Sequence, residues 1–231
     1  MFKSVIWASS IDFPEHIATV LFVGKCNWAC SYCHNKALAS LPSINFREEI
    51  IPRLIERKSL VNRVVISGGE PTIYEELPEV IKHLREEGFH VGLHTNGSNP
   101  EMITKVIDML EFIGMDLKTS AEGYRDTIFK NMKNGIMVNN LAAVPRSAEI
   151  IAENTQITSE FRTTILPSVT TPGDIKWVAK YLKSLNIDHY VLQQFNNKFM
   201  DVTEELEQYN EATLENIIKD CNKILPTTIR K

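Results

Sequence analysis

The chain has 231 residues, of which 43% are hydrophobic and 23% charged, proportions typical of folded globular proteins. Its net charge of −4, without any basic run, argues against a general surface for nucleic acid or anionic membranes. No apolar stretch approaches the ~20 residues that span a bilayer, and the N-terminus lacks the pattern of a signal peptide.

Short apolar, β-rich runs alternate with amphipathic stretches along the chain. The runs predict six buried strands, at Ala18–Val23, Arg63–Ile66, His90–Leu93, Phe112–Leu117, Glu160–Ile165 and His189–Phe195. Apolar residues at helical spacing predict helices near residues 77–84, 103–110 and 175–182. Strands that alternate with helices predict an α/β protein with a parallel sheet. The length suits a partial (βα)6 TIM-like barrel better than a full barrel, which takes ~250 residues.

No linker or low-complexity stretch divides the chain, so we expect one domain over residues 1–231. Its core is predicted at about 16–195, followed by a C-terminal helical extension at about 200–225. Cys221 lies on the apolar face of that extension, where a free cysteine behaves as a small hydrophobic residue. A less favoured alternative is a role for Cys221 as a metal ligand or resolving thiol.

Polar or unusual residues follow four of the predicted strands. The strands run in turn into GKCNWACSYCHN, SGGEPT, HTNG and DLK. Because the carboxyl ends of parallel strands meet at one edge of a sheet, we expect these four segments to face a common crevice.

The first of these segments contains Cys26, Cys30 and Cys33. Thiols this close together predict a reducing compartment, such as the cytoplasm, and a metal. Three thiolates can hold three irons of a [4Fe–4S] cluster and leave the fourth iron open to another ligand. One alternative is a zinc site completed by His34, and another is three unconnected buried cysteines.

The spacing of these cysteines, with Tyr32 before the last, resembles the signature of radical S-adenosylmethionine (radical SAM) enzymes. The segment IDFPEHIATVLFVGKCNWACSYCHN is similar to activating enzymes of glycyl radical enzymes. It is most similar to the activating proteins of anaerobic ribonucleoside-triphosphate reductases, and the resemblance covers about residues 9–195. It implies that Cys26, Cys30 and Cys33 bind the cluster, whose open iron binds S-adenosylmethionine.

The resemblance further implies a set of residues that bind S-adenosylmethionine. These are Tyr32, Gly68, Gly69, Glu70, Asn96, Asp116, Lys118, Arg162 and Gln194. By this reading, the paired glycines let the backbone approach the methionine ammonium closely. Lys118 provides a cation for the methionine carboxylate, and Asp116 takes a ribose hydroxyl or a small cation.

Several of these residues also have a purely structural explanation. The two glycines suit a turn between strand and helix, and Asn96 suits a left-handed turn. The alternative for Asp116 and Lys118 is an ion pair, and Arg162 could be a buried arginine paired with a carboxylate.

The chain departs from the family pattern at two positions. Many relatives carry Asp directly before Thr-Asn-Gly, where this chain has His94, which puts the small-cation site in doubt. Relatives also often carry Gly where this chain has Glu15, a change that nothing in the sequence explains.

The implied function is reductive cleavage of S-adenosylmethionine to a 5′-deoxyadenosyl radical that takes hydrogen from a glycine of a partner glycyl radical enzyme. Residues 34–62 contain no cysteine for a second cluster, so the electron is expected from an external donor such as flavodoxin or ferredoxin. One alternative is a radical SAM enzyme that acts on a small molecule or peptide, like 7-carboxy-7-deazaguanine synthase. Another is a metal-binding or electron-transfer protein without catalysis.

Overall fold

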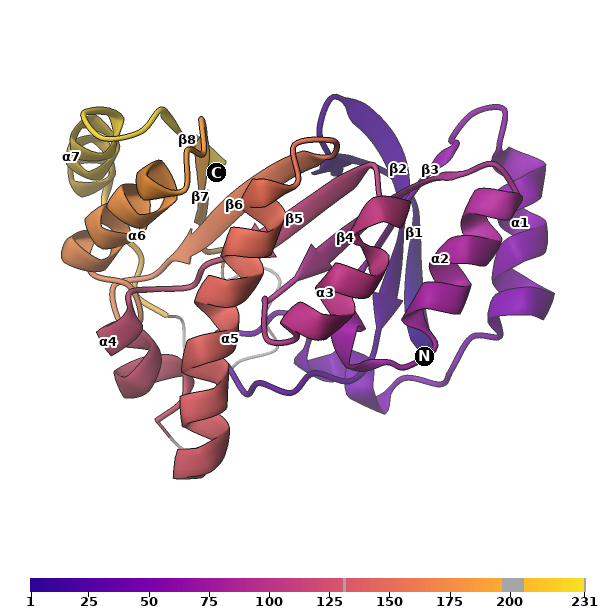
Figure 1. Ribbon diagram of the computed structural model, residues 1–231, viewed down its shortest axis with the longest axis horizontal. Helices are drawn as coiled ribbons and strands as arrows, with labels where there is room; N and C mark the ends of the chain where they lie inside the picture. Colours follow the sequence, from indigo (N-terminus) through magenta and orange to yellow (C-terminus); the bar gives the residue numbers. More distant parts are fainter. Residues whose placement is uncertain (131, 197–205, 231) are drawn as a thin grey trace.

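The computed structural model describes residues 1–130, 132–196 and 206–230, and their strands form one curled sheet (Figure 1). The strands are β1 (Phe2–Phe13), β2 (His16–Val23), β3 (Arg63–Gly68), β4 (His90–Thr95), β5 (Phe112–Asp116), β6 (Thr158–Ile165), β7 (Tyr190–Gln194) and β8 (Thr227–Arg230). They lie in chain order, with β1 antiparallel to β2 and every later pair parallel. Strands β2 to β7 confirm the six predicted strands and the predicted partial barrel.

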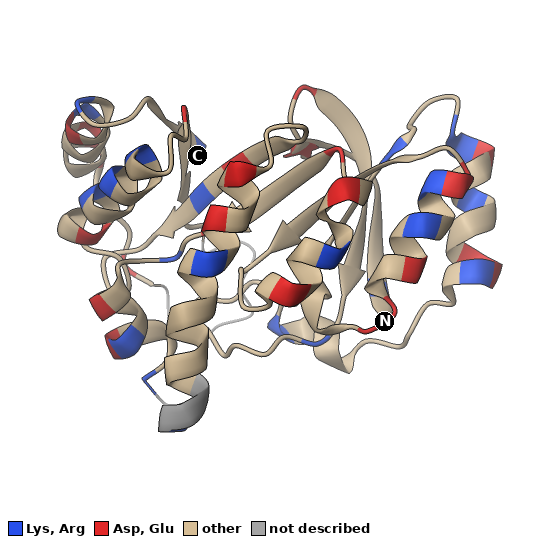
Figure 2. Cartoon of the chain, viewed as in Figure 1, with Lys and Arg blue, Asp and Glu red and all other residues tan. Residues whose placement is uncertain are grey.

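Helices pack along one face of this sheet (Figure 1). They are α1 (Ile51–Arg57), α2 (Leu77–Glu86), α3 (Pro100–Val106), α4 (Ala121–Gly123), α5 (Asn134–Glu153), α6 (Pro172–Ser184) and α7 (Glu211–Asn222). Lysine and arginine are interspersed with aspartate and glutamate along the helices (Figure 2). Within the described ranges, no helix is both long and apolar enough to cross a membrane.

The predicted helices are confirmed as α2, α3 and α6, and α7 lies within the predicted C-terminal extension. The first residues of that extension, 200–205, are outside the described part of the chain. Side-chain caps define where these helices begin. Asn99 accepts a hydrogen bond from the Met102 amide at 3.1 Å, and Thr171 forms a capping box with Asp174 before α6.

Strands β1 and β8 and helix α5 are not among the elements predicted from the sequence. The two strands form the edges of the sheet, so they lack the continuous apolar run of a strand covered on both faces. Helix α5 contains Pro145, a residue that normally disfavours a helix interior.

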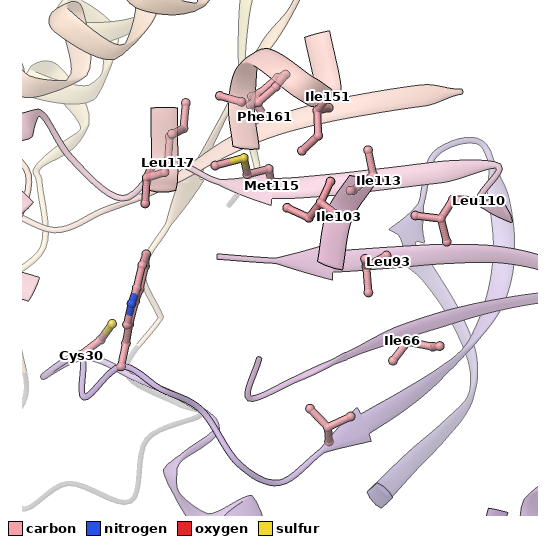
Figure 3. Close-up of a cluster of buried hydrophobic side chains, with 14 of the residues drawn as sticks. Cys30, Ile66, Leu93, Ile103, Leu110, Ile113, Met115, Leu117, Ile151 and Phe161 are labelled. Atoms are coloured by element: carbon pink, nitrogen blue, oxygen red, sulfur yellow. The ribbon is translucent and has the colours of Figure 1, made fainter. Parts of the chain in front are cut away.

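The hydrophobic core lies between the sheet and the helices (Figure 3). Leu93, Met115 and Phe161 point from neighbouring strands toward Ile103 and Ile151 on the helices, and all five are buried. Successive residues of a strand point to opposite faces. The strand residues adjacent in sequence to Leu93, Met115 and Phe161 therefore point to the concave face of the sheet. This alternation sends His94, Asp116 and Arg162 into the interior of the barrel.

The amino-terminal end of that interior is filled by a second apolar cluster. It consists of Phe13, Ala18, Val20, Val65 and Phe112. The rings of Phe13 and Phe112 lie 5.3 Å apart between centroids, across the interior from β1 to β5. Access to the interior is therefore from the carboxyl end of the strands, where the predicted polar segments lie.

Candidate active site

A cavity of about 750 Å³ opens at the carboxyl end of the parallel strands. Its walls include nearly all residues that the sequence predicts for the site, namely Cys26, Cys30, Tyr32, Cys33, Gly68, Gly69, Glu70, Asn96, Asp116, Lys118 and Arg162. This volume is within the range typical of sites for small ligands and cofactors. The four predicted strand-end segments therefore do meet in one crevice.

The three clustered cysteines follow β2 and carry free thiols that face this cavity. Cys26 is exposed and accepts a hydrogen bond from the Trp28 amide at 3.4 Å, whereas Cys30 is buried. Although Cys26 as a residue is exposed, the protein around its thiol group reduces the hydration of the thiolate and raises the pKa of Cys26 to about 11. Burial also raises the pKa of Cys30. Because a thiol binds iron as the thiolate, we expect metal uptake to release protons.

The cysteine loop is anchored by a tryptophan that the sequence analysis did not single out. The Trp28 indole Nε1 donates to Asn140 Oδ1 of α5 at 3.0 Å, and its ring packs edge-on against Tyr124 and Phe129. The sequence signal that could have identified Trp28 is the presence of a large aromatic residue within a polar cysteine loop. Its partner Asn140 is far away in the sequence and carries no comparable signal.

Asn96 connects the end of β4 to the same loop. Its side-chain Nδ2 donates to Asn27 Oδ1 at 3.1 Å and lies 3.9 Å from Cys26 Sγ. The Asn27 amide in turn donates to Ser98 Oγ at 2.8 Å. Asn96 thus contacts the cysteine loop itself, a role that the sequence did not indicate.

The paired glycines at the end of β3 allow close packing on the start of the cysteine loop. Gly68 has a φ of 111°, which favours glycine. A Cβ on Gly69 would lie 2.1 Å from the carbonyl oxygen of Lys25, so no side chain fits there. The Glu70 amide donates to that same oxygen at 2.9 Å. The glycine pair therefore has a structural role in this turn, whatever it contacts in a bound ligand.

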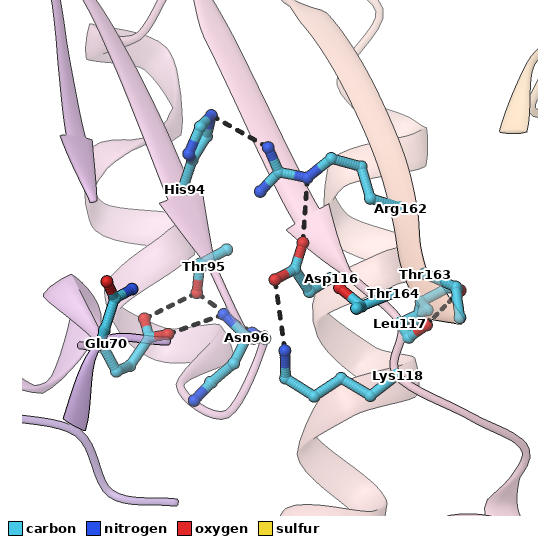
Figure 4. A network of polar contacts seen from close by, with 12 residues as sticks. Glu70, His94, Thr95, Asn96, Asp116, Leu117, Lys118, Arg162, Thr163 and Thr164 are labelled. Carbon is cyan, nitrogen blue, oxygen red and sulfur yellow. Dashed lines mark hydrogen bonds and ion pairs between the residues drawn. The ribbon is translucent and has the colours of Figure 1, made fainter. Parts of the chain in front are cut away.

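The Glu70 carboxylate is fully buried and accepts hydrogen bonds from two loops (Figure 4). Its Oε1 accepts from the amide and hydroxyl of Thr72 at 3.0 and 2.6 Å and from the Thr95 hydroxyl at 2.7 Å. Its Oε2 accepts from the Asn96 amide at 2.7 Å. Burial raises the pKa of Glu70, and these hydrogen bonds oppose the rise. The carboxylate therefore fastens the end of β3 to the end of β4.

Replacing Glu70 by glutamine should lower the free energy of unfolding by about 1–3 kcal/mol, because the new amide NH2 would face hydrogen-bond donors. Urea denaturation under anaerobic conditions measures the change. Glu75→Gln, at an exposed position a few residues away, is the matched control and should have almost no effect. Equal stability of both variants would show that the carboxylate does not fasten the two loops.

Charged side chains of β5 and β6 form a second network inside the cavity (Figure 4). Arg162 Nε donates to Asp116 Oδ1 at 2.9 Å, and Lys118 Nζ donates to Asp116 Oδ2 at 3.3 Å. Burial alone would raise the pKa of Asp116, but the two cations outweigh it and hold that pKa well below its usual range. Burial opposes the charge on Lys118, yet Tyr32 and Asp116 keep the pKa of Lys118 well above its usual range. Both structural alternatives, the Asp116–Lys118 pair and the Arg162–carboxylate pair, are present.

His94 extends this network across the barrel. Its Nε2 lies 3.2 Å from Arg162 Nη1 and 3.0 Å from the Asp12 carbonyl oxygen, and its Nδ1 lies 3.2 Å from Ser67 Oγ. Burial, together with the Arg162 guanidinium, holds the pKa of His94 well below its usual range, so the ring is neutral. A neutral ring beside a carboxylate already paired with two cations gives no support to the expected small-cation site at Asp116.

The prediction for Gln194 needs a correction. Gln193 lines the cavity, whereas Gln194 points away and lies 3.5 Å from Gln208 in an exposed contact. Successive residues of a strand point to opposite faces, so a shift of one residue changes which glutamine faces the interior. The sequence predicts a cavity position for Gln194, and the structure places Gln193 on the cavity wall instead.

The residues present fit a cluster and a bound cosubstrate. The Tyr32 hydroxyl is buried and has no hydrogen-bond partner among the described residues, which suits a contact with a ligand. His34, the fourth ligand of the zinc alternative, instead stacks on Phe195 at 4.8 Å between ring centroids. No group of three His, Cys, Asp or Glu side chains in the described ranges surrounds a point that could hold one metal ion. An iron–sulfur cube differs in that each thiolate binds its own iron.

Comparison with known proteins identifies the family. The sequence pattern of the Radical SAM superfamily matches residues 20–137. A Methanocaldococcus jannaschii protein, provisionally named as a glycyl-radical enzyme activating enzyme, is 29% identical over 96% of this chain and 90% of its own length. The pyruvate formate-lyase-activating enzyme of Clostridium pasteurianum is 25% identical over 96% of this chain and 93% of its own.

The fold is also similar to that of a solved structure. The crystal structure of Streptococcus suis SuiB bound to S-adenosylmethionine superimposes with a TM-score of 0.62 at 16% identity. The match covers 90% of this chain but only 48% of SuiB. The chain belongs to the radical SAM superfamily, whose enzymes use a [4Fe–4S] cluster and S-adenosylmethionine.

Proposed function

We propose that this enzyme introduces a glycyl radical into a partner enzyme. The observation that carries the proposal is the similarity to an activating enzyme and to a second protein provisionally named as one, in each case over at least 90% of both lengths. The cavity lined by three free thiols supports it. The proposed partner is an anaerobic ribonucleoside-triphosphate reductase, which the cysteine segment favours by resemblance.

In this proposal Cys26, Cys30 and Cys33 bind the cluster, and one iron stays open for S-adenosylmethionine. When bound and reduced, the cluster supplies the electron that cleaves S-adenosylmethionine to methionine and a 5′-deoxyadenosyl radical, which takes hydrogen from the partner's glycine. Lys118 provides the cation for the methionine carboxylate. Its pairing with Asp116 fixes the ammonium group before the ligand arrives, which lowers the cost of ordering it.

The remaining residues shape the cavity and limit access to it. The apolar cluster that includes Phe13 and Phe112 fills the amino-terminal end of the barrel and blocks entry at that end. A loop of the partner must therefore enter at the carboxyl end of the strands. Cys221 is buried on α7 and does not line the cavity, so we expect the electron to come from an external donor such as flavodoxin or ferredoxin.

Electron paramagnetic resonance tests the proposal directly. We expect the reduced enzyme, mixed anaerobically with S-adenosylmethionine and the reductase, to produce the doublet of a glycyl radical. A reductase whose radical-forming glycine is replaced by alanine is the control and should give no doublet. Absence of a doublet with every candidate glycyl radical enzyme, together with turnover of a small molecule, would favour the alternative resembling 7-carboxy-7-deazaguanine synthase.

A further inference from the structure

The main-chain amide of Trp28 points at one of the three clustered sulfur atoms. Its N–H donates to Cys26 Sγ at 3.4 Å, a shorter contact than the 3.9 Å between Asn96 Nδ2 and the same sulfur. Hydrogen bonds to the sulfur ligands are among the factors that set the reduction potential of an iron–sulfur cluster. The orientation of Trp28 therefore affects how readily a cluster bound at Cys26 accepts an electron.

The side chain of Trp28 is fixed by a directional contact as well as by packing. Its ring packs edge-on against Tyr124 and Phe129, at 5.8 and 5.2 Å between ring centroids. Its indole Nε1 donates to Asn140 Oδ1 of α5 at 3.0 Å, and Trp28 and Asn140 are only 7% and 8% exposed. Aromatic packing tolerates some rotation of the ring, whereas a hydrogen bond weakens steeply as its angle departs from linearity. The contact with Asn140 therefore sets the angle of the indole, and with it the direction of the Trp28 main chain.

Helix α5 is a rigid support for this contact, because hydrogen bonds tie it to other elements of the fold. The buried Ser147 hydroxyl donates to the Gly97 carbonyl oxygen, in the turn after β4, at 2.8 Å. The Pro145 carbonyl oxygen accepts from the Tyr181 hydroxyl of α6 at 3.1 Å. Asn140 is thus held in place relative to the sheet, and its contact with Trp28 extends that support to the cysteine loop.

Helix propensity and burial do not explain an asparagine at position 140. Asparagine is a poorer helix former than leucine, and burying its amide costs free energy unless the amide is hydrogen-bonded. Asn140 does not line the cavity, so its influence on the site is indirect. Its hydrogen bond to the Trp28 indole provides that connection.

We infer that Asn140 is a positioning residue for the cluster: through the Trp28 indole, it holds the Trp28 amide against Cys26 Sγ and thereby raises the reduction potential of the bound cluster. The inference rests on the proposed function, in which Cys26, Cys30 and Cys33 bind that cluster. An N–H group directed at a thiolate sulfur stabilises negative charge, and the reduced cluster carries one more negative charge than the oxidised one. Loss of the contact with Asn140 should therefore make the cluster harder to reduce.

The test compares Asn140→Leu with Asn139→Leu. The two asparagines are adjacent on α5, but Asn139 is exposed whereas Asn140 is buried against Trp28. Each variant is reconstituted anaerobically and its iron content is measured. The midpoint potential of the cluster is then determined, without S-adenosylmethionine, by a redox titration followed by electron paramagnetic resonance. Trp28→Phe, which keeps an aromatic ring but removes the indole donor, is measured alone and in combination with Asn140→Leu.

We expect Asn140→Leu to lower the ratio of reduced to oxidised cluster at a fixed potential about three- to tenfold, which lowers the midpoint potential by about 30–60 mV for one electron. Trp28→Phe should cause a similar shift, and the double variant should shift no further, because both substitutions remove the same hydrogen bond. Asn139→Leu should match the wild type.

Equal potentials for Asn140→Leu and Asn139→Leu, with the cluster intact, would overturn the inference and leave the proposed function standing. An unchanged potential in Trp28→Phe would do the same, whether or not Asn140→Leu folds. Additive shifts in the double variant would also overturn it, because Asn140 would then act independently of the indole. If the wild type took up no cluster, the cysteine ligands of the proposed function would be wrong, and this inference with them.

Discussion

Replacing Cys30 by alanine should reduce the iron content of the anaerobically reconstituted protein from about four per chain to below about one. The reason is that Cys30 is the central thiol of the three and the most buried, so its loss leaves two thiolates to hold a cube. Iron and sulfide assays measure the effect, and the signal of the reduced cluster in electron paramagnetic resonance should disappear with it. Cleavage of S-adenosylmethionine should fall below detection.

The chain offers a matched control for this experiment in Cys221. It is also a free, buried cysteine, but it packs on α7 among apolar residues away from the cavity. Cys221→Ala should keep the full complement of iron. If Cys221→Ala lost as much iron as Cys30→Ala, the cluster would not be held by the three clustered cysteines alone.

Replacing Arg162 by methionine should lower the free energy of unfolding at pH 7 by about 3 kcal/mol. This is the low end for breaking a buried ion pair, because a quarter of the Asp116 side chain is exposed. The substitution leaves Asp116 with Lys118 as its nearest cation and removes one of the two polar neighbours of His94 Nε2, the other being the Asp12 carbonyl oxygen. Urea denaturation under anaerobic conditions measures the loss.

The effect should also depend on pH. Arg162 holds the folded-state pKa of Asp116 below its unfolded value of ~3.9, so the stabilisation is complete above that value and is lost as pH falls toward the folded pKa. The difference between wild type and Arg162→Met should therefore shrink below about pH 4. Arg146→Met, which breaks an exposed pair with Glu149, should cost at most about 1 kcal/mol. A loss for Arg162→Met as small as for this control would mean that the Asp116 pair does not stabilise the fold.

The sequence predicted the parallel strands and the cysteine segment because each has a strong local signal. Strands covered on both faces appear as continuous apolar runs, and the residues after them converge wherever the sheet is parallel. The edge strands β1 and β8 lack that signal, and α5 contains Pro145, a residue that disfavours a helix interior. Pairing partners distant in the sequence, such as Trp28 and Asn140, could not be predicted from either residue alone.

At the site itself, prediction from the sequence was limited by strand register and by side-chain partners from separate strands. The structure places Asn96, Asp116, Lys118 and Arg162 on the cavity wall, but on β7 it places Gln193 there instead of Gln194. Thr164 of β6 also lines the cavity, and the sequence did not single it out. The sequence also could not decide whether Glu70 and Asp116 contact a ligand or other side chains. The structure shows both carboxylates engaged within the protein, and this depends on partners brought together from separate strands.

Cleavage of S-adenosylmethionine can be measured by reducing the anaerobically reconstituted protein in its presence and quantifying 5′-deoxyadenosine by liquid chromatography. We predict that 5′-deoxyadenosine and methionine form in equal amounts, and only when the protein carries its cluster and a reductant is present. Protein that carries a fully reduced cluster, seen by electron paramagnetic resonance, and yet forms no 5′-deoxyadenosine would contradict the account.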